Sequence, residues 1–227
     1  MNFSRHSALL WAKIIIYCWL LIPVVCVAAW AGANEVFIKT RYENGAFDTE
    51  AYIVPEAPPE LMYEVVSDID SLLRRLDIDA LMWALKGLAG KEEGKNLIQI
   101  EYKGGNYDPD TNVFDFFLEL YAGSMKRQFK NIRITVLMTS ERDGNGDPVI
   151  AAELCNPNFF LKSAGGTMSI RQKGGKREFA VQVSVRFAWF FNLFITTSNY
   201  CAIAEWRIGA FLENMKDETA RRERARG

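Results

Sequence analysis

The chain has 227 residues, which is enough for one substantial domain. Hydrophobic residues make up 49% and charged residues 24% of it, so the chain belongs to neither the disordered nor the fibrous class. Lys and Arg total 27 against 28 Asp and Glu, and this balance argues against a general nucleic-acid binder, which carries a basic excess. The only histidine, His6, lies in a targeting segment, so histidine triads and histidine-rich zinc sites are excluded from the domain that follows.

The N-terminal segment has the three parts of a secretory signal. Arg5 and Lys13 form a basic start, an uncharged and mostly apolar stretch covers residues 14–31, and Ala29-Trp30-Ala31 is an A-x-A cleavage site. The uncharged stretch has 18 residues and is just long enough to remain in the membrane as an uncleaved anchor, so both fates stay open. In either case we expect the rest of the chain to be exported, to the periplasm or the extracellular space, either free or anchored.

The sequence divides into three parts. We expect residues 1–33 to be the signal peptide or membrane anchor, residues 34–216 to be one domain, and residues 217–227 to be a charged tail. The domain contains Cys155 and Cys201, and an oxidising compartment permits one disulfide between them. The alternative is two separate buried thiols that behave as small apolar side chains.

The domain begins with a predicted hairpin. Val36–Tyr42 and Phe47–Val54 have the composition of strands, and Asn44-Gly45 between them supplies the positive φ angles of a tight turn. A helix is predicted over Pro59–Leu76, because apolar residues recur there at helical spacing and proline is tolerated in a first turn. A second short helix is predicted over Ile78–Leu88.

From Asn96 the apolar residues recur with the two-residue period of strands. Short turns rich in glycine and aspartate separate these strands, which favours antiparallel hairpins. The chain ends in one long predicted helix, from about Thr197 to Arg221, with arginines near its C-terminus that complement the helix dipole. The six strands predicted in this part are Leu97–Lys103, Val113–Tyr121, Ile132–Ser140, Val149–Cys155, Thr167–Gln172 and Phe179–Phe191.

Two runs near the start of the domain resemble the opening of the START-like superfamily, also called the polyketide cyclase/dehydrase-like (SRPBCC) or helix-grip superfamily. They are residues 47–54, FDTEAYIV, and residues 57–70, APPELMYEVVSDID, which read as a strand and then a helix that begins in a proline-containing turn. Gly165-Gly166 before a strand and the amphipathic C-terminal helix fit as well, and the resemblance covers residues 36–216.

This resemblance implies an α+β helix-grip fold. Its parts are a curved antiparallel sheet of six to seven strands, a long C-terminal helix packed against that sheet, and two short helices after the first strand. The resemblance also implies a deep apolar cavity between sheet and helix, and such cavities bind lipids, sterols, polyketides or other hydrophobic small molecules. A few relatives are cyclases or dehydratases, and many are carriers.

The apolar residues expected to bind a ligand lie on two strands and on the final helix. The small Ala204 leaves space at mid-helix, so we expect the ligand to lie opposite it, against Phe116 or Leu118 and Phe187. Ordinary core packing is the alternative for all of these positions. The helix contributes a single stripe that consists of Tyr200, Ala204, Ile208 and Phe211.

Four further residues complete the expected binding set. Glu153 and Arg186 interrupt apolar strands and would fix a polar group of the ligand, unless they face solvent as alternate strand residues do. Phe159 and Phe160 belong to a candidate lid over residues 156–166. Such a lid would serve as a gate or a membrane-contacting tip, unless its aromatic rings tuck under the sheet.

The sequence contains few other motifs that indicate a chemical function. It has no catalytic constellation, no metal site and no nucleotide-binding loop, so we expect no cofactor and no metal. Asp143-Gly144-Asn145-Gly146-Asp147 is similar to the start of a calcium loop but lacks the glutamate at position twelve, where Leu154 stands. We expect this run to be a hairpin turn.

Three functions follow as alternatives. The first is a noncatalytic exported domain that binds a hydrophobic small molecule or lipid in an internal cavity. The second is a cyclase, dehydratase or hydrolase that acts on a hydrophobic substrate there and needs at least two converging polar side chains. The third is a structural or interaction protein with a filled core. The lack of histidine and the few polar candidates favour binding, and the N-terminal segment would add a membrane contact.

Overall fold

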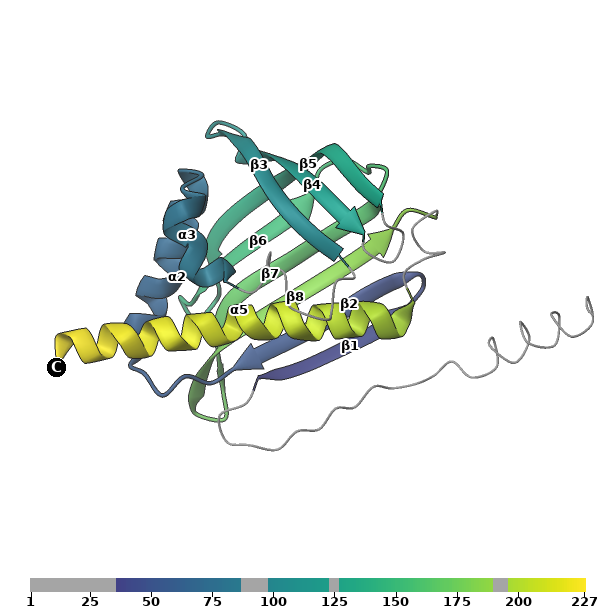
Figure 1. Ribbon diagram of the computed structural model, residues 1–227. Helices are drawn as coiled ribbons and strands as arrows, with labels where there is room; N and C mark the ends of the chain where they lie inside the picture. Colours follow the sequence, from purple (N-terminus) through teal and green to yellow (C-terminus); the bar gives the residue numbers. More distant parts are fainter. Residues whose placement is uncertain (1–35, 87–97, 123–126, 190–195) are drawn as a thin grey trace, which may run out of the picture.

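The computed structural model describes residues 36–86, 98–122, 127–189 and 196–227. The helices and strands follow the order expected from the sequence, with two helices between the first hairpin and the remaining strands (Figure 1). The strands are β1 Phe37–Glu43, β2 Ala46–Ile53, β3 Ile98–Asp108, β4 Val113–Ala122, β5 Arg127–Arg142, β6 Pro148–Leu154, β7 Leu161–Lys173 and β8 Lys176–Phe187. The helices are α2 Pro59–Arg74, α3 Ile78–Leu85 and α5 Thr197–Arg226.

The eight strands form one antiparallel sheet in the order β1-β2-β8-β7-β6-β5-β4-β3. The sheet is larger than the six or seven strands expected, because both strands of the N-terminal hairpin join it. Phe47 of β2 lies opposite Val185 of β8, and Ile53 lies opposite Phe179, so the hairpin extends the sheet beyond β8.

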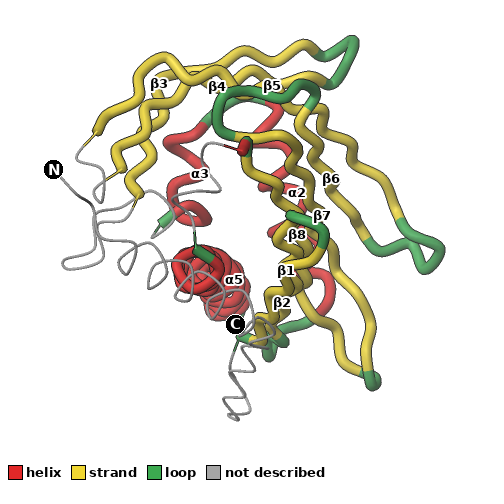
Figure 2. Tube along the Cα trace, turned by 90° about the vertical axis from the view of Figure 1, so that its right-hand side faces the viewer, coloured by secondary structure: helices red, strands yellow, loops and turns green. Residues whose placement is uncertain are grey.

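The three helices lie on one face of the curved sheet, which we call the inner face (Figure 2). α5 contacts β1, β2 and β8, while α2 and α3 pack against α5 nearer its C-terminal end. In the part of the chain that the structure describes, the opposite or outer face carries no helix. A long C-terminal helix held by a curved antiparallel sheet is the helix-grip fold, as predicted.

Local sequence explains where the helices begin. Pro59 stands in the first turn of α2, where its missing N–H costs no hydrogen bond. The Asp77 carboxylate caps α3 by accepting the N–H of Ala80 at 3.1 Å, and the Thr196 hydroxyl caps α5 by accepting the N–H of Asn199 at 3.2 Å. The end of the second predicted helix, residues 87–88, lies outside the described residues.

The core lies between the inner face and the helices. Its larger part is at the end of the sheet where α2, α3 and the second half of α5 meet. Residues there with no exposed surface include Val65, Phe114, Ile170, Phe179, Leu212 and Met215. A smaller buried cluster at the first turns of α5 consists of Phe47, Tyr200 and Ala204.

Ion pairs fasten the last turns of α5 to α2. α5 continues to Arg226, past the predicted end at Arg221, through residues expected to form a charged tail. Arg222 reaches Asp68 of α2 at 2.7 Å and Glu218 of its own helix at 2.8 Å. These charged residues therefore join two helices of the fold.

Cys155 is exposed and Cys201 is buried, and neither forms a disulfide. Because Cys155 stands in the connection after β6, the alternative of two buried thiols is wrong for this residue. Among the described residues, no helix is both long enough and apolar enough to cross a membrane.

Candidate functional site

The inner face holds the apolar strand residues that the sequence predicts to line a cavity. Residues directly opposite each other in neighbouring antiparallel strands share a face. Phe114, Phe116 and Leu118 stand at every second position of β4 and therefore share one face. Val185 and Phe187 are spaced in the same way on β8. The pairing places one inner row across five strands, namely Thr49, Val183, Gly166, Ala152 and Met138.

The predicted stripe of α5 meets this face at its first turns. The ring of Tyr200 stacks on that of Phe47, with centroids 4.1 Å apart and planes at 23°. Phe187 presents its edge to both rings, at 6.0 Å from Phe47 and 5.9 Å from Tyr200. Ala204 is buried in the same cluster, and the half-buried Ile208 packs against it. The structure therefore brings together Phe187 and three of the four predicted helix residues.

Phe211, Phe116 and Leu118 lie outside this small cluster. Phe211 and Phe116 are half-buried and pack against the main core, where the Phe116 ring lies 5.9 Å from that of Phe114. Leu118 is half-buried one step further along β4. The predicted apolar residues thus share one side of the sheet but belong to two clusters.

The inner face is closed at one end and partly accessible at the other. Phe114 and Phe179, near α2 and α3, have no exposed surface. Towards the end where α5 begins, Leu118, Ile134 and Phe187 are half-buried, while Phe47 and Ile132 are buried. An apolar surface that remains accessible inside a fold is what a site for a hydrophobic ligand requires.

Glu153 and Arg186 lie on the outer face, away from the predicted apolar residues. Glu153 is exposed. It lies opposite Leu137 of β5 and Gly165 of β7, on the face of the sheet that points away from α5. Arg186 alternates with Phe187 on β8 and is half-buried. Both polar residues of the predicted set therefore lie on the opposite side of the sheet from the rest.

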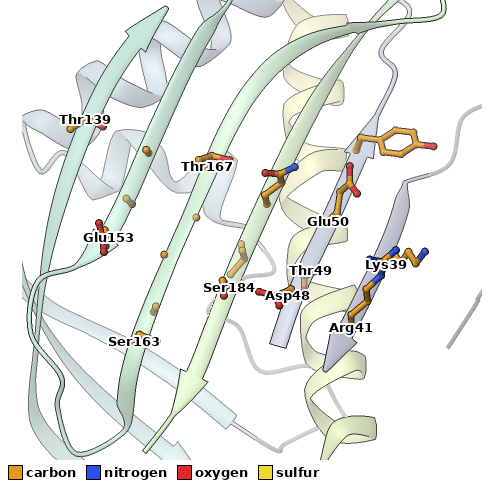
Figure 3. A pocket seen from close by; sticks show the side chains of 18 of the residues that line it. Lys39, Arg41, Asp48, Thr49, Glu50, Thr139, Glu153, Ser163, Thr167 and Ser184 are labelled. Carbon is orange, nitrogen blue, oxygen red and sulfur yellow. The ribbon is translucent and has the colours of Figure 1, made fainter. Parts of the chain in front are cut away.

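The outer face carries an open groove of about 920 Å³ that crosses six strands, from β1 to β5 (Figure 3). Strand pairing sets two rows of side chains along it. One row is Lys39, Glu50, Gln182, Thr167, Ala151 and Thr139, and the other is Arg41, Asp48, Ser184, Gly165, Glu153 and Leu137. Sequence reasoning missed this groove, because it placed the expected ligand, including the contact with Glu153, on the inner side of the sheet.

One wall of the groove is aromatic and basic. The Phe37 and Tyr52 rings stack with centroids 4.7 Å apart, and the Lys173 ammonium lies 4.8 Å from the Tyr52 centroid. Lys39 and Arg41 of β1 stand beside Asp48 and Glu50 of β2, so opposite charges alternate within the wall (Figure 3). The groove is therefore polar and nearly balanced in charge.

The candidate lid is shorter than expected. β7 begins at Leu161, so only residues 155–160 connect it to β6. The Asn158 side chain holds this connection by accepting the N–H groups of Phe160 at 2.9 Å and Leu161 at 2.8 Å. Phe159 is exposed, while Phe160 is half-buried and lies 5.2 Å from the ring of Phe129. Of these two adjacent aromatic residues, Phe159 is therefore exposed at the surface, and Phe160 packs against Phe129.

Arg207 of α5 is a candidate that sequence reasoning missed. It stands three residues after Ala204 and four before Phe211, which is the spacing of the predicted apolar stripe. It is half-buried, and burial lowers the pKa of its guanidinium, whose carbon lies 5.8 Å from the Trp206 ring centroid. The helical spacing was the available signal for it.

The run that is similar to a calcium loop is the β5–β6 turn. The Asp143 carboxylate accepts the N–H groups of Asn145 at 2.8 Å and Asp147 at 2.9 Å. Asp147 is buried and accepts the hydroxyl of Tyr63 at 2.5 Å, and its burial and the nearby charge of Asp143 raise its pKa. These groups fasten the turn to α2. Within the described ranges, no group of three His, Cys, Asp or Glu side chains is placed to hold a metal ion.

No family model and no curated protein sequence matches the chain. Solved structures do match it. The Zhui aromatase/cyclase from Streptomyces sp. R1128 has a TM-score of 0.46 and 15% identity over 80% of this chain and 98% of that one. A STAR-related lipid transfer protein from Xanthomonas axonopodis has a TM-score of 0.44 and 12% identity over 83% of this chain and 97% of that one.

The di-domain aromatase/cyclase StfQ from the steffimycin biosynthetic pathway has a TM-score of 0.46 and 10% identity over 78% of this chain. The chain spans about half the length of StfQ and of the similar di-domain protein BexL. The fold is the helix-grip fold. Its element order, its single antiparallel sheet and its long C-terminal helix are those implied by the sequence resemblance.

Proposed function

We propose that this chain is an exported START-like domain that binds a hydrophobic small molecule or a lipid between the inner face of the sheet and α5, without catalysing a reaction. The observation that carries the proposal is the uneven burial of the inner face. Phe114 and Phe179, near α2, have no exposed surface, whereas Leu118, Ile134 and Phe187, towards the end where α5 begins, are half-buried beside the buried Phe47 and Ile132.

The middle of the inner face favours the same interpretation. Ala152 of β6 lies opposite Gly166 of β7, and both are half-buried, as is Ala164. These small residues occupy positions where bulkier side chains would fill the space between sheet and helix. A ligand there would lie over small residues and touch the larger Leu118 and Phe187 with its apolar body.

The polar groups favour binding over catalysis. General acid–base or nucleophilic chemistry needs two or more polar side chains that converge on the substrate. Glu153 and Arg186, the polar residues of the predicted set, lie on the other face of the sheet. Arg207 is a single cation on the helix stripe, suited to orienting an anionic or polar group of the ligand.

Two adjacent alanines provide a matched test of the inner site. Ala152 faces inwards and Ala151 faces outwards, at neighbouring positions of β6. We expect Ala152→Phe to occupy the ligand's space and abolish copurification of a hydrophobic ligand, as measured by native mass spectrometry. Ala151→Phe should leave the ligand bound.

Two outcomes would contradict the proposal. If no ligand copurifies with the parent protein, no hydrophobic probe raises its melting temperature, and Ala152→Phe costs about 1–3 kcal/mol of stability, then the space is ordinary packed core. Turnover of a hydrophobic substrate that Ala152→Phe abolishes would instead favour the cyclase, dehydratase or hydrolase alternative.

Export is a separate part of the proposal and rests on the N-terminal sequence. Fractionation of cells that express the full chain should place it outside the cytoplasm. N-terminal sequencing that starts near residue 32 or 34 would show cleavage after the A-x-A site, whereas an intact N-terminus in the membrane fraction would show an anchor. A soluble cytoplasmic chain would exclude both fates.

A further inference from the structure

The groove on the outer face has the dimensions of a site for a chain-like ligand. It crosses six strands, from β1 to β5, and has a volume of about 920 Å³. Neighbouring strands lie about 4.8 Å apart, so the groove is roughly 24 Å long across the strands. Its two rows of side chains are two residues apart along each strand, which is roughly 7 Å. The groove is therefore long and narrow.

Short side chains form the floor of the groove, and longer ones stand at its side. Lys39 and Arg41 of β1 and Glu50 of β2 stand beside the floor (Figure 3). A chain laid across the strands can therefore rest on the floor and meet polar side chains at one side. The floor residues of β6, β7 and β8 include Ala151, Gly165, Thr167 and Ser184.

The polar side chains of the groove keep their hydrogen-bonding groups free for a ligand. Elsewhere on the outer face, β4 and β5 pair such groups with each other. The Asp115 carboxylate accepts from the Arg133 guanidinium and the Thr135 hydroxyl, at 2.6 Å each. Among the residues that the structure describes, six groove side chains make no hydrogen bond or ion pair with another residue, namely Lys39, Arg41, Glu153, Thr167, Gln182 and Ser184. The groove therefore presents free donors and free acceptors side by side.

These features disfavour other chain-like ligands. The carboxylates of Asp48, Glu50 and Glu153 stand among the cations and would repel the phosphates of a nucleic acid. A lipid tail needs an apolar floor, but the exposed Phe37 and Leu137 stand at opposite ends of the groove. A peptide adds to a sheet along its edge, whereas this groove lies across the face, where the ladder already uses the backbone groups.

A chain of neutral sugars matches the groove in chemistry and in spacing. Each unit carries several hydroxyl groups, and a hydroxyl both donates to a carboxylate and accepts from an ammonium or guanidinium group. The distance between strands is close to the length of one sugar unit in an extended β-1,4-linked chain, so successive units meet successive strands.

One end of the groove adds an aromatic surface. The C–H face of a sugar ring packs well on an aromatic ring, and Phe37 is 40% exposed while it stacks on Tyr52 with centroids 4.7 Å apart. We propose that the outer groove binds an extended, neutral oligosaccharide of about five units.

This site is separate from the one proposed on the inner face and does not rest on it. The backbone of the sheet lies between the two sites. Ala151 and Ala152, which are neighbours on β6, face opposite sides of the sheet and belong to different sites.

Isothermal titration calorimetry with protein purified from cells that express the full chain tests the proposal. The probes are cellohexaose, mannohexaose, xylohexaose and N-acetylchitohexaose, all β-1,4-linked. At least one should bind, and about tenfold more tightly than its trimer, because a trimer reaches only half of the strands. Maltohexaose, whose α-linked chain coils, should bind about tenfold more weakly than that hexaose. Addition of about 0.5 M sodium chloride should change the affinity by less than about twofold, because the ligand carries no charge.

Variants locate the binding in the groove. Ala151→Phe places a ring on the floor and should weaken hexaose binding at least about tenfold. Arg41→Ala with Gln182→Ala removes two free hydrogen-bonding groups and should also weaken it about tenfold. Arg133→Gln removes an exposed cation from the same face outside the groove and should leave the affinity unchanged. Melting temperatures should match that of the parent, and the Arg41 and Gln182 double variant serves alone if Ala151→Phe melts early.

Three results would overturn the proposal. The first is that none of the four β-1,4-linked hexaoses binds the parent. The second is that the well-folded groove variants bind the hexaose as the parent does. The third is that a neutral glycine–serine peptide of similar length binds in place of the hexaoses and is lost in Ala151→Phe, which would assign the groove to a protein segment. Failure of the inner site is a separate result, because it is read from the hydrophobic ligand and from Ala152→Phe.

Discussion

The ring of Tyr200 in the first turn of α5 stacks on the ring of Phe47 in β2, with centroids 4.1 Å apart. This stack fixes the start of the last helix over the N-terminal hairpin of the sheet. The other end of α5 is fixed to α2 by the 2.7 Å ion pair between Arg222 and Asp68. The helix is thus held near both ends, and its middle turns, around Ile208, lie over the inner face where we place the ligand.

Removal of the Tyr200 ring should destabilise the domain. Tyr200 is 9% and Phe47 2% exposed, so Tyr200→Ala leaves a cavity and should lower the free energy of unfolding by about 3 kcal/mol. Tyr200→Phe keeps the stack and should cost about 1 kcal/mol or less. Urea denaturation measures both values. Equal losses for the two variants would show that the hydroxyl, and not the stack, holds the helix.

Arg74 at the end of α2 should matter far more than its neighbour Arg75. Arg74 donates to Tyr107 and Asn112 at 2.8 Å each and pairs with Asp70 at 3.1 Å, so it ties α2 to the β3–β4 hairpin. We expect Arg74→Ala to lower the free energy of unfolding by about 1.5–3 kcal/mol. Arg75 is exposed, and among the described residues its side chain donates to Ser71 of its own helix, so Arg75→Ala is the control and should change stability by less than about 0.5 kcal/mol. A similar loss in both variants would refute the specific role of Arg74.

The sequence predicted most of the fold because its local signals agree with each other. The Asn44-Gly45 turn, with positive φ at both residues, and the proline in the first turn of α2 fall where expected. Strand ends were less predictable. β7 begins at Leu161 and β5 at Arg127, ahead of their predicted starts, because these extensions are polar or glycine-rich and are held by pairing with neighbouring strands.

The candidate site was predictable only in part. Apolar alternation identified the inner residues such as Phe116 and Phe187, because one face of an antiparallel sheet must be buried. It did not reveal that Glu153 and Arg186 lie on the other face, since the face of a residue depends on the register with its partner strands. The outer groove likewise arises from residues that only the strand order brings together.

Acid should weaken the attachment of α5 to α2. Hydrogen bonds from Arg221 and then Arg222 lower the pKa of Glu218 despite its burial, so the native state favours the ionised carboxylate. Its contribution to stability is therefore complete above the ordinary pKa of glutamic acid, near 4.5, and is lost as the pH falls through the lowered native value.

Glu218→Gln tests this directly, because glutamine has the same size and does not titrate. We expect the variant to be less stable than the parent at neutral pH, with the difference shrinking as the pH falls below about 4.5. Thermal melts between pH 3 and pH 7, a range of about four units chosen around that value, measure it. A stability difference that stays constant over this range would show that the charge of Glu218 contributes nothing.

Arg207 should select among ligands by their polar group. It shares the helix stripe of Ala204 and Phe211, and its guanidinium stays protonated at neutral pH even though burial lowers its pKa. A fatty acid presents a carboxylate that an arginine can bind with two hydrogen bonds, whereas a fatty alcohol of the same chain length does not. Arg207→Gln should therefore weaken binding of the acid about tenfold and leave the alcohol nearly unchanged, as measured by displacement of a fluorescent lipid probe.

Arg186→Gln removes an arginine from the outer face and should affect neither ligand. If Arg207→Gln weakens both ligands equally, Arg207 supports the helix without contacting the polar group, and if it weakens neither, the ligand lies elsewhere on the inner face.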